Sequence, residues 1–226
     1  MDATHPLAVV TPTLDGDVLT HLALTRAAFT PGQLARLLPP KSRGENQDLR
    51  PVSVEGVRKV LNRLAHQGIV TATRVGNSAV TYELNREHLA ADGVVALANQ
   101  ARTLRTRLEE HLEGWGTPPV YAALFGSWAR GAATVDSDVD LFLVRPDDAD
   151  EDEWADQVDE LQHRVSRWTG NDARPFVIDE TDLPPMATEP VLASIRTEGL
   201  TVHGDPNWLR KRVRPRRLIK RNMETS

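Results

Sequence analysis

Cysteine is absent from this sequence of 226 residues, which excludes disulfide bonds and thiolate metal sites. No apolar run approaches the roughly 20 residues that a helix needs to span a bilayer, so we expect no membrane partner. The first residues lack a basic segment followed by an apolar one, and we therefore expect no secretion signal and a cytoplasmic location. The seven histidines are scattered along the chain, without a pair at the spacing of metal ligands.

The rest of the composition is that of an ordinary globular protein, with 40% hydrophobic and 26% charged residues. A chain of this length fits two domains of about 100 residues better than a single domain. Function must therefore be read from the order of the segments and from their motifs.

The net charge of −5 hides a strong segregation of charge along the chain. Bases outnumber acids by ten to eight in residues 1–90, whereas acids outnumber bases by 23 to nine in residues 91–208. Residues 209–226 hold eight bases and one acid. Such segregation predicts parts with different partners. The basic end could contact nucleic acid phosphates, or it could fold back over the acidic region.

The first 85 residues predict three helices followed by a β-hairpin. Apolar spacing indicates a first helix over residues 15–29, and Thr30-Pro31-Gly32-Gln33 has the pattern of a capping box that starts a second. Ser53 is a plausible cap for the third helix, which Gly68 would end. Two strand-like runs, 69–75 and 78–84, are then joined by Gly76-Asn77, a hairpin signal.

This order of elements resembles a winged helix-turn-helix, and the stretch 53–64 resembles the recognition helix of bacterial regulators with that fold. Its solvent face would present side chains that can meet phosphates and base edges in a major groove, with one more basic residue in the hairpin. These DNA-binding candidates are Arg58, Lys59, Asn62, Arg63 and Arg74, with His66 on the same helix face. The alternative is a solvated helix face in a protein–protein module.

Residues 87–113 predict one long connecting helix. Leucines recur along it at near-heptad spacing and form a narrow apolar stripe. The stripe could pack on the neighbouring domain, which we favour slightly, or it could pair with a second copy in a dimer.

From residue 120 the pattern changes to alternating strands and helices. An apolar run is followed by the turn Gly126-Ser127, then by Arg130 and, after a polar loop, by a second strand that carries Asp138 and Asp140. Because these carboxylates are two residues apart on a strand, they point to the same face and repel unless a cation lies between them. Mg²⁺ is the expected cation, with Mn²⁺ as an alternative, because it takes oxygen ligands and shares them with substrate phosphates.

The series Gly126-Ser127, Arg130-Gly131 and Ser137-Asp138-Val139-Asp140-Leu141 resembles the minimal nucleotidyltransferases of the polymerase-β superfamily, over residues 115–205. The resemblance implies transfer of a nucleoside monophosphate from an NTP. It also implies metal binding and catalysis by the two aspartates, with Gly126, Ser127 and Arg130 at the nucleotide.

Members of that family also carry a third carboxylate on the next strand, as metal ligand and base. Phe176 falls at that position when the following acidic segment is aligned. Asp179 has the wrong strand parity in a regular strand, although a bulge would bring it to the right face, and Glu180 has the right parity but lies roughly 13 Å further along at about 3.3 Å per residue. Loss of a general base would slow the reaction by about 10²–10⁴-fold.

The sequence therefore predicts an α+β chain with a winged helix-turn-helix domain (1–90), a helical connector (91–114), a nucleotidyltransferase domain with a mixed sheet (115–205) and a basic tail (206–226). We expect an enzyme that moves a nucleoside monophosphate from an NTP to a hydroxyl, on a macromolecular acceptor, while the winged helix binds DNA. The alternative is a DNA-binding regulator, or an antitoxin with a protein toxin as partner, whose nucleotidyltransferase fold binds nucleotide with little or no catalysis.

Overall fold

The computed structural model describes residues 1–42, 49–76, 79–183 and 189–213. Two compact units make up the chain, Met1–Gln100 and Ala101–Ser226. None of the described helices is long and apolar enough to cross a membrane.

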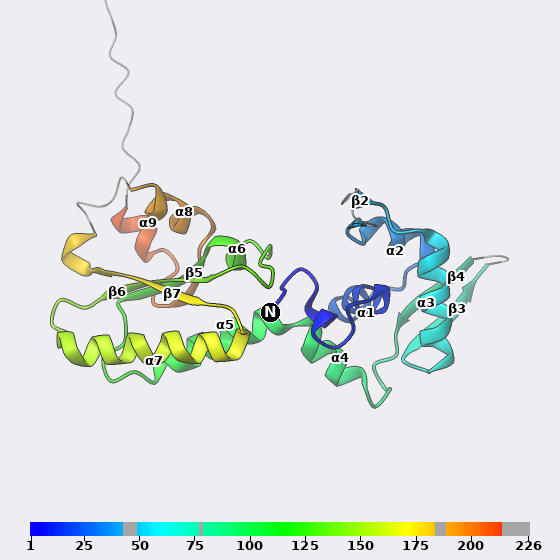
Figure 1. The fold of residues 1–226 in the computed structure, drawn as a ribbon, viewed down its shortest axis with the longest axis horizontal. Helices are drawn as coiled ribbons and strands as arrows, with labels where there is room; N and C mark the ends of the chain where they lie inside the picture. Colours follow the sequence, from blue (N-terminus) through cyan, green and yellow to red (C-terminus); the bar gives the residue numbers. More distant parts are fainter. Residues whose placement is uncertain (43–48, 77–78, 184–188, 214–226) are drawn as a thin grey trace, which may run out of the picture. The chain divides into compact units, whose positions relative to one another are not determined.

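The first unit contains helices and a two-stranded hairpin (Figure 1). In chain order its elements are η1 (Pro6–Val9), α1 (Leu14–Leu24), α2 (Pro31–Leu37), β1 (Lys41–Ser42), β2 (Leu49–Arg50), α3 (Val54–His66), β3 (Val70–Val75), β4 (Ala79–Leu84) and α4 (Ala91–Ala98). Strands β3 and β4 pair antiparallel, from Val70 opposite Leu84 to Val75 opposite Ala79. The predicted turn residue Asn77 and the predicted strand residue Ser78 lie outside the described residues.

Two helix starts in this unit follow the predicted capping chemistry. The Thr30 side chain accepts a hydrogen bond from the Gln33 N–H, and the Gln33 side chain accepts one from the Thr30 N–H. Ser53 Oγ accepts from the Gly56 N–H at the start of α3. These contacts satisfy backbone donors that a helix start leaves without partners.

The first helix is shorter than the sequence predicts, because α1 ends at Leu24 with an extended Thr25 as its cap. Phe29, expected on this helix, instead exchanges two backbone hydrogen bonds with Tyr82 on β4, at 2.9 and 2.8 Å. The chain before α2 therefore forms a short bridge to the edge of the hairpin. Pairing to a distant strand has overridden a helical pattern that was only local.

A single apolar core holds the first unit together. It draws on η1, α1, α2, α3, the hairpin and α4, and its fully buried leucines and valines include Leu7, Val18, Leu22, Leu34, Val57 and Leu61. Ala91 and Ala98 of α4 belong to the same core. Residues 91–98, predicted as the start of a connector, thus pack as part of the first unit.

The second unit contains a four-stranded mixed sheet with helices on both faces (Figure 1). Its elements are α5 (Gln100–Glu113), β5 (Tyr121–Phe125), α6 (Gly126–Ala129), β6 (Val139–Arg145), α7 (Glu151–Thr169), β7 (Ala173–Asp179), η2 (Glu180–Asp182), α8 (Pro190–Glu198), β8 (Leu200–His203) and α9 (Trp208–Arg212). The strand order is β7-β6-β5-β8, in which only the β6–β7 pair is parallel.

One face of this sheet is covered by α8 and α9. Every second residue of β5 and of β6 points to this face, and Tyr121, Ala123, Phe142 and Val144 share a core with both helices. The opposite face carries α7, which ends at Gly170 with a left-handed φ of 72°. Figure 1 shows α7 lying along the sheet on the side away from α8 and α9.

The predicted connecting helix is two helices, because α4 ends at Asn99 and α5 starts at Gln100. The leucine stripe Leu104, Leu108 and Leu112 is buried. Rings of α5 and of the segment after it contact α7: His111 meets Trp168 edge to face at 6.0 Å, and Trp115 meets Trp154 at 5.3 Å. The stripe therefore belongs to a helix of the second unit, in agreement with the favoured domain packing.

The basic segment begins later than the sequence predicts. Residues 208–212 form α9, whose Leu209 is 1% exposed, and Val213 behind it is 2% exposed. Trp208 stacks on Tyr121 with ring centroids 5.6 Å apart. These apolar side chains fold the first part of the predicted tail onto the domain, whereas the basic residues from Arg214 onward lie outside the described residues.

Candidate functional site

Two carboxylates stand at the start of β6. Asp138 directly precedes the strand and Asp140 is its second residue. Because side chains alternate along a strand, Asp140 shares the face of Phe142 and Val144, which α8 and α9 cover further along. The carboxylate pair therefore lies at the open end of this face, immediately beyond an apolar core.

Gly126 brings the backbone against one of these carboxylates. It follows β5, opens α6 and has a left-handed φ of 67°. A Cβ atom at this position would lie 2.2 Å from Asp140 Oδ2. Only glycine fits, both for the backbone conformation and for the close approach.

The environment of Asp140 disfavours its charged form. Burial raises the pKa of Asp140 above its ordinary value, and the neighbouring Asp138 carboxylate raises it further, while Arg174 and Arg130 oppose both effects. A group of positive charge beside the pair would thus stabilise the ionised state.

The neighbouring strand supplies such a charge. In the parallel β6–β7 pair Arg174 lies opposite Asp140, and Arg174 Nη1 is 2.9 Å from Asp138 Oδ2. Arg174 could not be predicted from the sequence, because strand register is needed to place it. The only sequence signal was its position near the start of a predicted strand.

The acidic residues considered as a third carboxylate are bound elsewhere. Asp179 receives two hydrogen bonds from Arg145, at 2.7 and 2.9 Å, and Glu180 pairs with Arg212 at 2.9 Å. Phe176 lies opposite Phe142 and packs against its ring, with centroids 5.8 Å apart. Neither acid therefore completes the carboxylate pair.

The loop before Asp138 is held by a buried side-chain amide, which the sequence also did not predict. Asn171 is 4% exposed, and its Nδ2 lies 3.0, 3.2 and 2.7 Å from the carbonyl oxygens of Thr134, Val135 and Ser137. One residue further on, the Asp172 carbonyl accepts from the Val139 N–H at 2.8 Å. The segment after α7 thus fixes the entry of β6 and with it Asp138.

The two remaining predicted nucleotide-binding residues flank the pair on the other side. Ser127 follows Gly126 in α6, whose Trp128 is buried and anchors the helix. The Arg130 guanidinium pairs with Glu198 at the end of α8, at 2.9 Å. Contact of Arg130 with a phosphate would require it to exchange this exposed ion pair.

The donors around the pair fit one divalent cation. Two carboxylate oxygen donors on one face are what Mg²⁺ usually takes from a protein, with phosphates and water completing its shell. Across the described parts of the chain no group of three acidic or histidine side chains could enclose a metal. Asp138 and Asp140 would therefore hold such a cation together with a bound phosphate chain.

Residues 102–181 match the sequence profile of the nucleotidyltransferase domain. This part of the chain is a nucleotidyltransferase domain. The match spans α5 to η2 and includes Gly126, Ser127, Asp138 and Asp140. It confirms the resemblance drawn from the motif at the level of the domain.

Solved structures similar to this chain include a toxin–antitoxin with AMP-PNP (18% identity, 48% of this chain and 80% of that chain, TM-score 0.36). A mutant of the toxin–antitoxin MntA–HpeT has 18% identity over 45% of this chain and 73% of that chain, with a TM-score of 0.33. A protein from Sulfolobus solfataricus described as a putative nucleotidyltransferase has 20% identity over 47% of this chain and 84% of that chain, with a TM-score of 0.27. No curated protein matches the sequence.

In the first unit, several predicted DNA-binding side chains of α3 have partners within the unit. Arg58 pairs with Glu55 at 2.8 Å, and Arg63 pairs with Asp15 of α1. Asn62 Oδ1 accepts from the Tyr82 hydroxyl at 2.9 Å. Lys59 and His66 on α3 and Arg74 on β3 are exposed and make no such contact with any residue that the structure describes.

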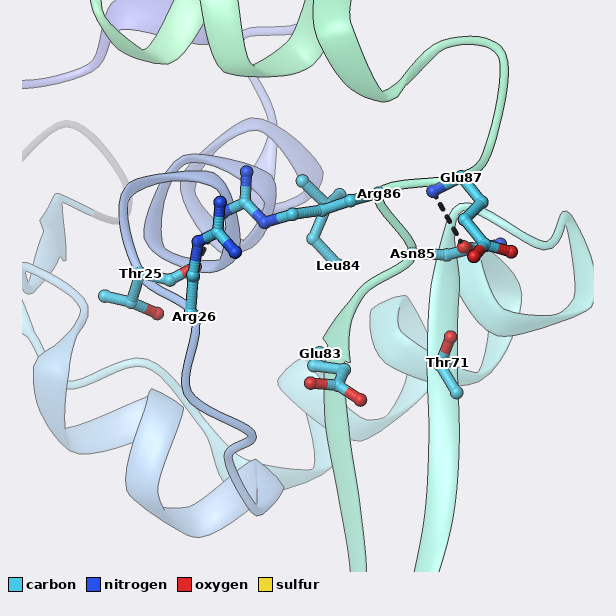
Figure 2. Close-up of a pocket in the computed structure, with 8 residues that line it drawn as sticks. All are labelled: Thr25, Arg26, Thr71, Glu83, Leu84, Asn85, Arg86 and Glu87. Carbon is cyan, nitrogen blue, oxygen red and sulfur yellow. Dashed lines mark hydrogen bonds between the residues drawn. The ribbon is translucent and has the colours of Figure 1, made fainter.

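A pocket of about 580 Å³ opens at the base of the hairpin in the same unit (Figure 2). Arg86, one of the residues that line it, donates hydrogen bonds to the carbonyl oxygens of Ala23 and Thr25, at 2.9 and 2.8 Å. Asn85 Oδ1 accepts from the Glu87 N–H. These contacts tie the hairpin to the end of α1, so we assign the polar lining a structural role.

Proposed function

We propose that the nucleotidyltransferase domain binds an NTP with a divalent cation and slowly transfers its nucleoside monophosphate to an acceptor hydroxyl. The observation that carries this proposal is the pair Asp138 and Asp140, set on one face of β6 against the Gly126 backbone. The family match of residues 102–181 supports the same chemistry.

Each residue would have a defined task. Gly126 and Ser127 would receive phosphate oxygens at their backbone, and Arg130 would add charge once released from Glu198. Asp138 and Asp140 would hold the cation, which orients the α-phosphate and stabilises the departing pyrophosphate. The acceptor oxygen would form a bond to the α-phosphorus while the bond to the bridging oxygen breaks, and pyrophosphate would leave with the electron pair.

The proton of the acceptor hydroxyl would pass to water. Among the described residues no third carboxylate accompanies the pair, since Asp179 and Glu180 are engaged with arginines. We therefore expect turnover slower by about 10²–10⁴-fold than with a positioned base.

Labelling in cell lysate tests this function and reveals the acceptor. The parent protein, incubated with each labelled NTP and Mg²⁺, should transfer label to a specific acceptor. Asp138→Asn combined with Asp140→Asn should abolish transfer, whereas Asp136→Asn, the same change in the exposed preceding loop, should leave it intact. Equal labelling by the parent and the double variant, or none by either, would refute the proposal.

We propose as a second function that the first unit binds duplex DNA. Its α2, α3 and β3–β4 follow in the order of a winged helix-turn-helix, and α3 is capped by Ser53. Lys59 and Arg74 are the exposed basic residues best able to meet phosphates. Arg58 and Arg63 could join only by giving up ion pairs with Glu55 and Asp15.

Fluorescence anisotropy with a labelled duplex at several salt concentrations tests the second function. Lys59→Ala with Arg74→Ala should weaken binding and reduce the slope of log affinity against log salt by about two, because each phosphate contact contributes about 0.9. Arg105→Ala with Arg164→Ala, which removes two ion-paired arginines from α5 and α7, should change neither. An equal loss in both double variants would count against this surface.

A further inference from the structure

The carboxylate pair has a fixed positive charge beside it. Arg174 lies opposite Asp140 in the parallel pairing of β6 and β7, and its guanidinium contacts the Asp138 carboxylate at 2.9 Å. Paired residues of neighbouring strands point to the same side of a sheet. The guanidinium therefore lies on the face that carries both carboxylates.

β7 contributes no acidic side chain to the position that the Arg174 guanidinium holds beside Asp138 and Asp140. The residues of β7 on this face are Arg174, Phe176 and Ile178, of which the last two join the apolar core under α8. Asp179 has the other parity and pairs with Arg145. The third charged position beside the carboxylate pair is therefore cationic.

Charge decides how many divalent cations such a site can hold. Three carboxylates with two divalent cations carry a net charge of about +1, which suits the polyphosphate they receive. Asp138, Asp140 and the Arg174 guanidinium reach the same net charge with one divalent cation. A second divalent cation would add two positive charges, whereas the described acidic side chains on and beside β7 already pair with arginines: Asp172 with Arg174 at 4.0 Å, Asp179 with Arg145 and Glu180 with Arg212.

We infer that the site holds one divalent cation per bound nucleotide. In this inference the Arg174 guanidinium binds a phosphate and takes the place of a second divalent cation. This inference rests on the proposed nucleotide site. An arginine is always protonated, and its planar donors match phosphate oxygens in pairs.

The ion pair leaves Arg174 able to reach a phosphate. Its side chain is 63% exposed, and that of Asp138 is 34% exposed. Pairs that open to water are weak, so a phosphate chain on Gly126 and Ser127 can replace Asp138 as the partner of the guanidinium. Arg174 would then contact the nucleotide while Asp138 turns to the cation.

The number of bound cations can be counted directly. The full-length chain, in excess over an ATP analogue that cannot be cleaved between the α- and β-phosphates, is titrated with Mn²⁺. Loss of the free Mn²⁺ signal in electron paramagnetic resonance then gives the bound ions per analogue. The parent and Arg174→Lys should each hold one Mn²⁺ ion, and Arg174→Asp should hold two.

Affinity for the nucleotide provides the second readout. Arg174→Ala should weaken binding of the analogue about tenfold by calorimetry without added metal, because a phosphate contact is lost. Arg164→Ala, which also removes an exposed ion-paired arginine of this unit, should leave this affinity unchanged. Circular dichroism verifies that each variant is folded, as expected for exposed positions.

The outcomes separate this inference from the proposed function. Two Mn²⁺ ions in the parent, or one in Arg174→Asp, would overturn the inference and leave nucleotide binding in place. Equal affinities of Arg174→Ala and the parent would overturn the phosphate contact. A parent that binds neither the analogue nor Mn²⁺ would overturn the proposed function itself.

Discussion

At the scale of single residues, the candidate site depends on close approach. Gly126 directly follows β5 and Asp140 lies on β6, and the pairing of these strands places Phe125 opposite Asp140. The glycine that follows can therefore bring its backbone onto the carboxylate. The motif alone indicated that both residues matter, but the contact between them arises from sheet pairing.

Gly126→Ala should disrupt the site while leaving the fold largely intact. The new methyl would meet Asp140 Oδ2, and alanine is strained at a φ of 67°. We expect a loss of about 1–3 kcal/mol in the free energy of unfolding, typical of local backbone strain, and at least tenfold weaker nucleotide binding. Urea unfolding and calorimetry measure the two quantities. Gly131→Ala, also at positive φ but with open space around its Cβ, separates strain from steric contact.

His111 gives the second unit a pH-dependent stability. Burial, and then the charge of Arg164, lower the pKa of His111 below its ordinary value, with Glu160 opposing. Its Nε2 atom is buried and has no hydrogen-bond partner among the described residues, and its ring meets those of Trp115 and Trp168 edge to face. The folded state therefore binds the proton less readily than the unfolded state.

Stability should consequently fall as the pH drops below about 6.5, the ordinary histidine value, and be fully present above it. His111→Phe removes this titration and should reduce the difference in melting temperature between pH 8 and pH 5.5. Calorimetry at both values measures it. His163→Phe, on the exposed side of α7, should retain the dependence of the parent; an identical slope in His111→Phe would refute the assignment.

At the scale of elements, local signals predicted structure well where the chemistry is local. The capping pairs Thr30 with Gln33 and Ser53 with Gly56 formed as expected. Gly170 ends α7, and the alternation of β6 puts Asp138 and Asp140 on one face. Each of these depends on residues only two to four positions apart.

Features that depend on pairing between distant segments could not be predicted. Arg174 meets Asp138 because of the β6–β7 register, and Phe29 joins Tyr82 across the unit. Arg63 was likewise predicted to contact DNA from its place on the helix face alone, whereas it forms an ion pair with the distant Asp15. Composition and spacing carry no information on such partners.

Asn171→Ala tests how far the element after α7 positions the carboxylates. Loss of the buried amide leaves the carbonyls of Thr134, Val135 and Ser137 without it, which should cost about 1–3 kcal/mol in the free energy of unfolding. Nucleotide binding should weaken as well, because the loop before Asp138 loosens. Urea denaturation and calorimetry measure both. Asn207→Ala, at an exposed position, should be nearly neutral.

At the scale of the whole molecule, the chain divides into two units, each with its own apolar core. The boundary after Gln100 separates α4, which packs in the first core, from the buried leucines of α5. A fragment that starts at residue 101 retains every residue of the nucleotidyltransferase match, because that match begins at residue 102.

The position at which that fragment ends tests whether α9 is needed for the second unit to fold. A fragment of residues 101–213 should fold and bind nucleotide, because its core is built from its own side chains. A fragment of residues 101–205, the end of the domain predicted from sequence, lacks the buried Leu209 and Val213 and the stacking of Trp208 on Tyr121. Loss of two buried aliphatic side chains and one aromatic should cost about 4–8 kcal/mol, which is comparable to the whole stability of a domain. Circular dichroism and thermal melting should therefore show a cooperative transition for the longer fragment only. Equal melting of the two fragments would mean that α9 contributes nothing to the fold.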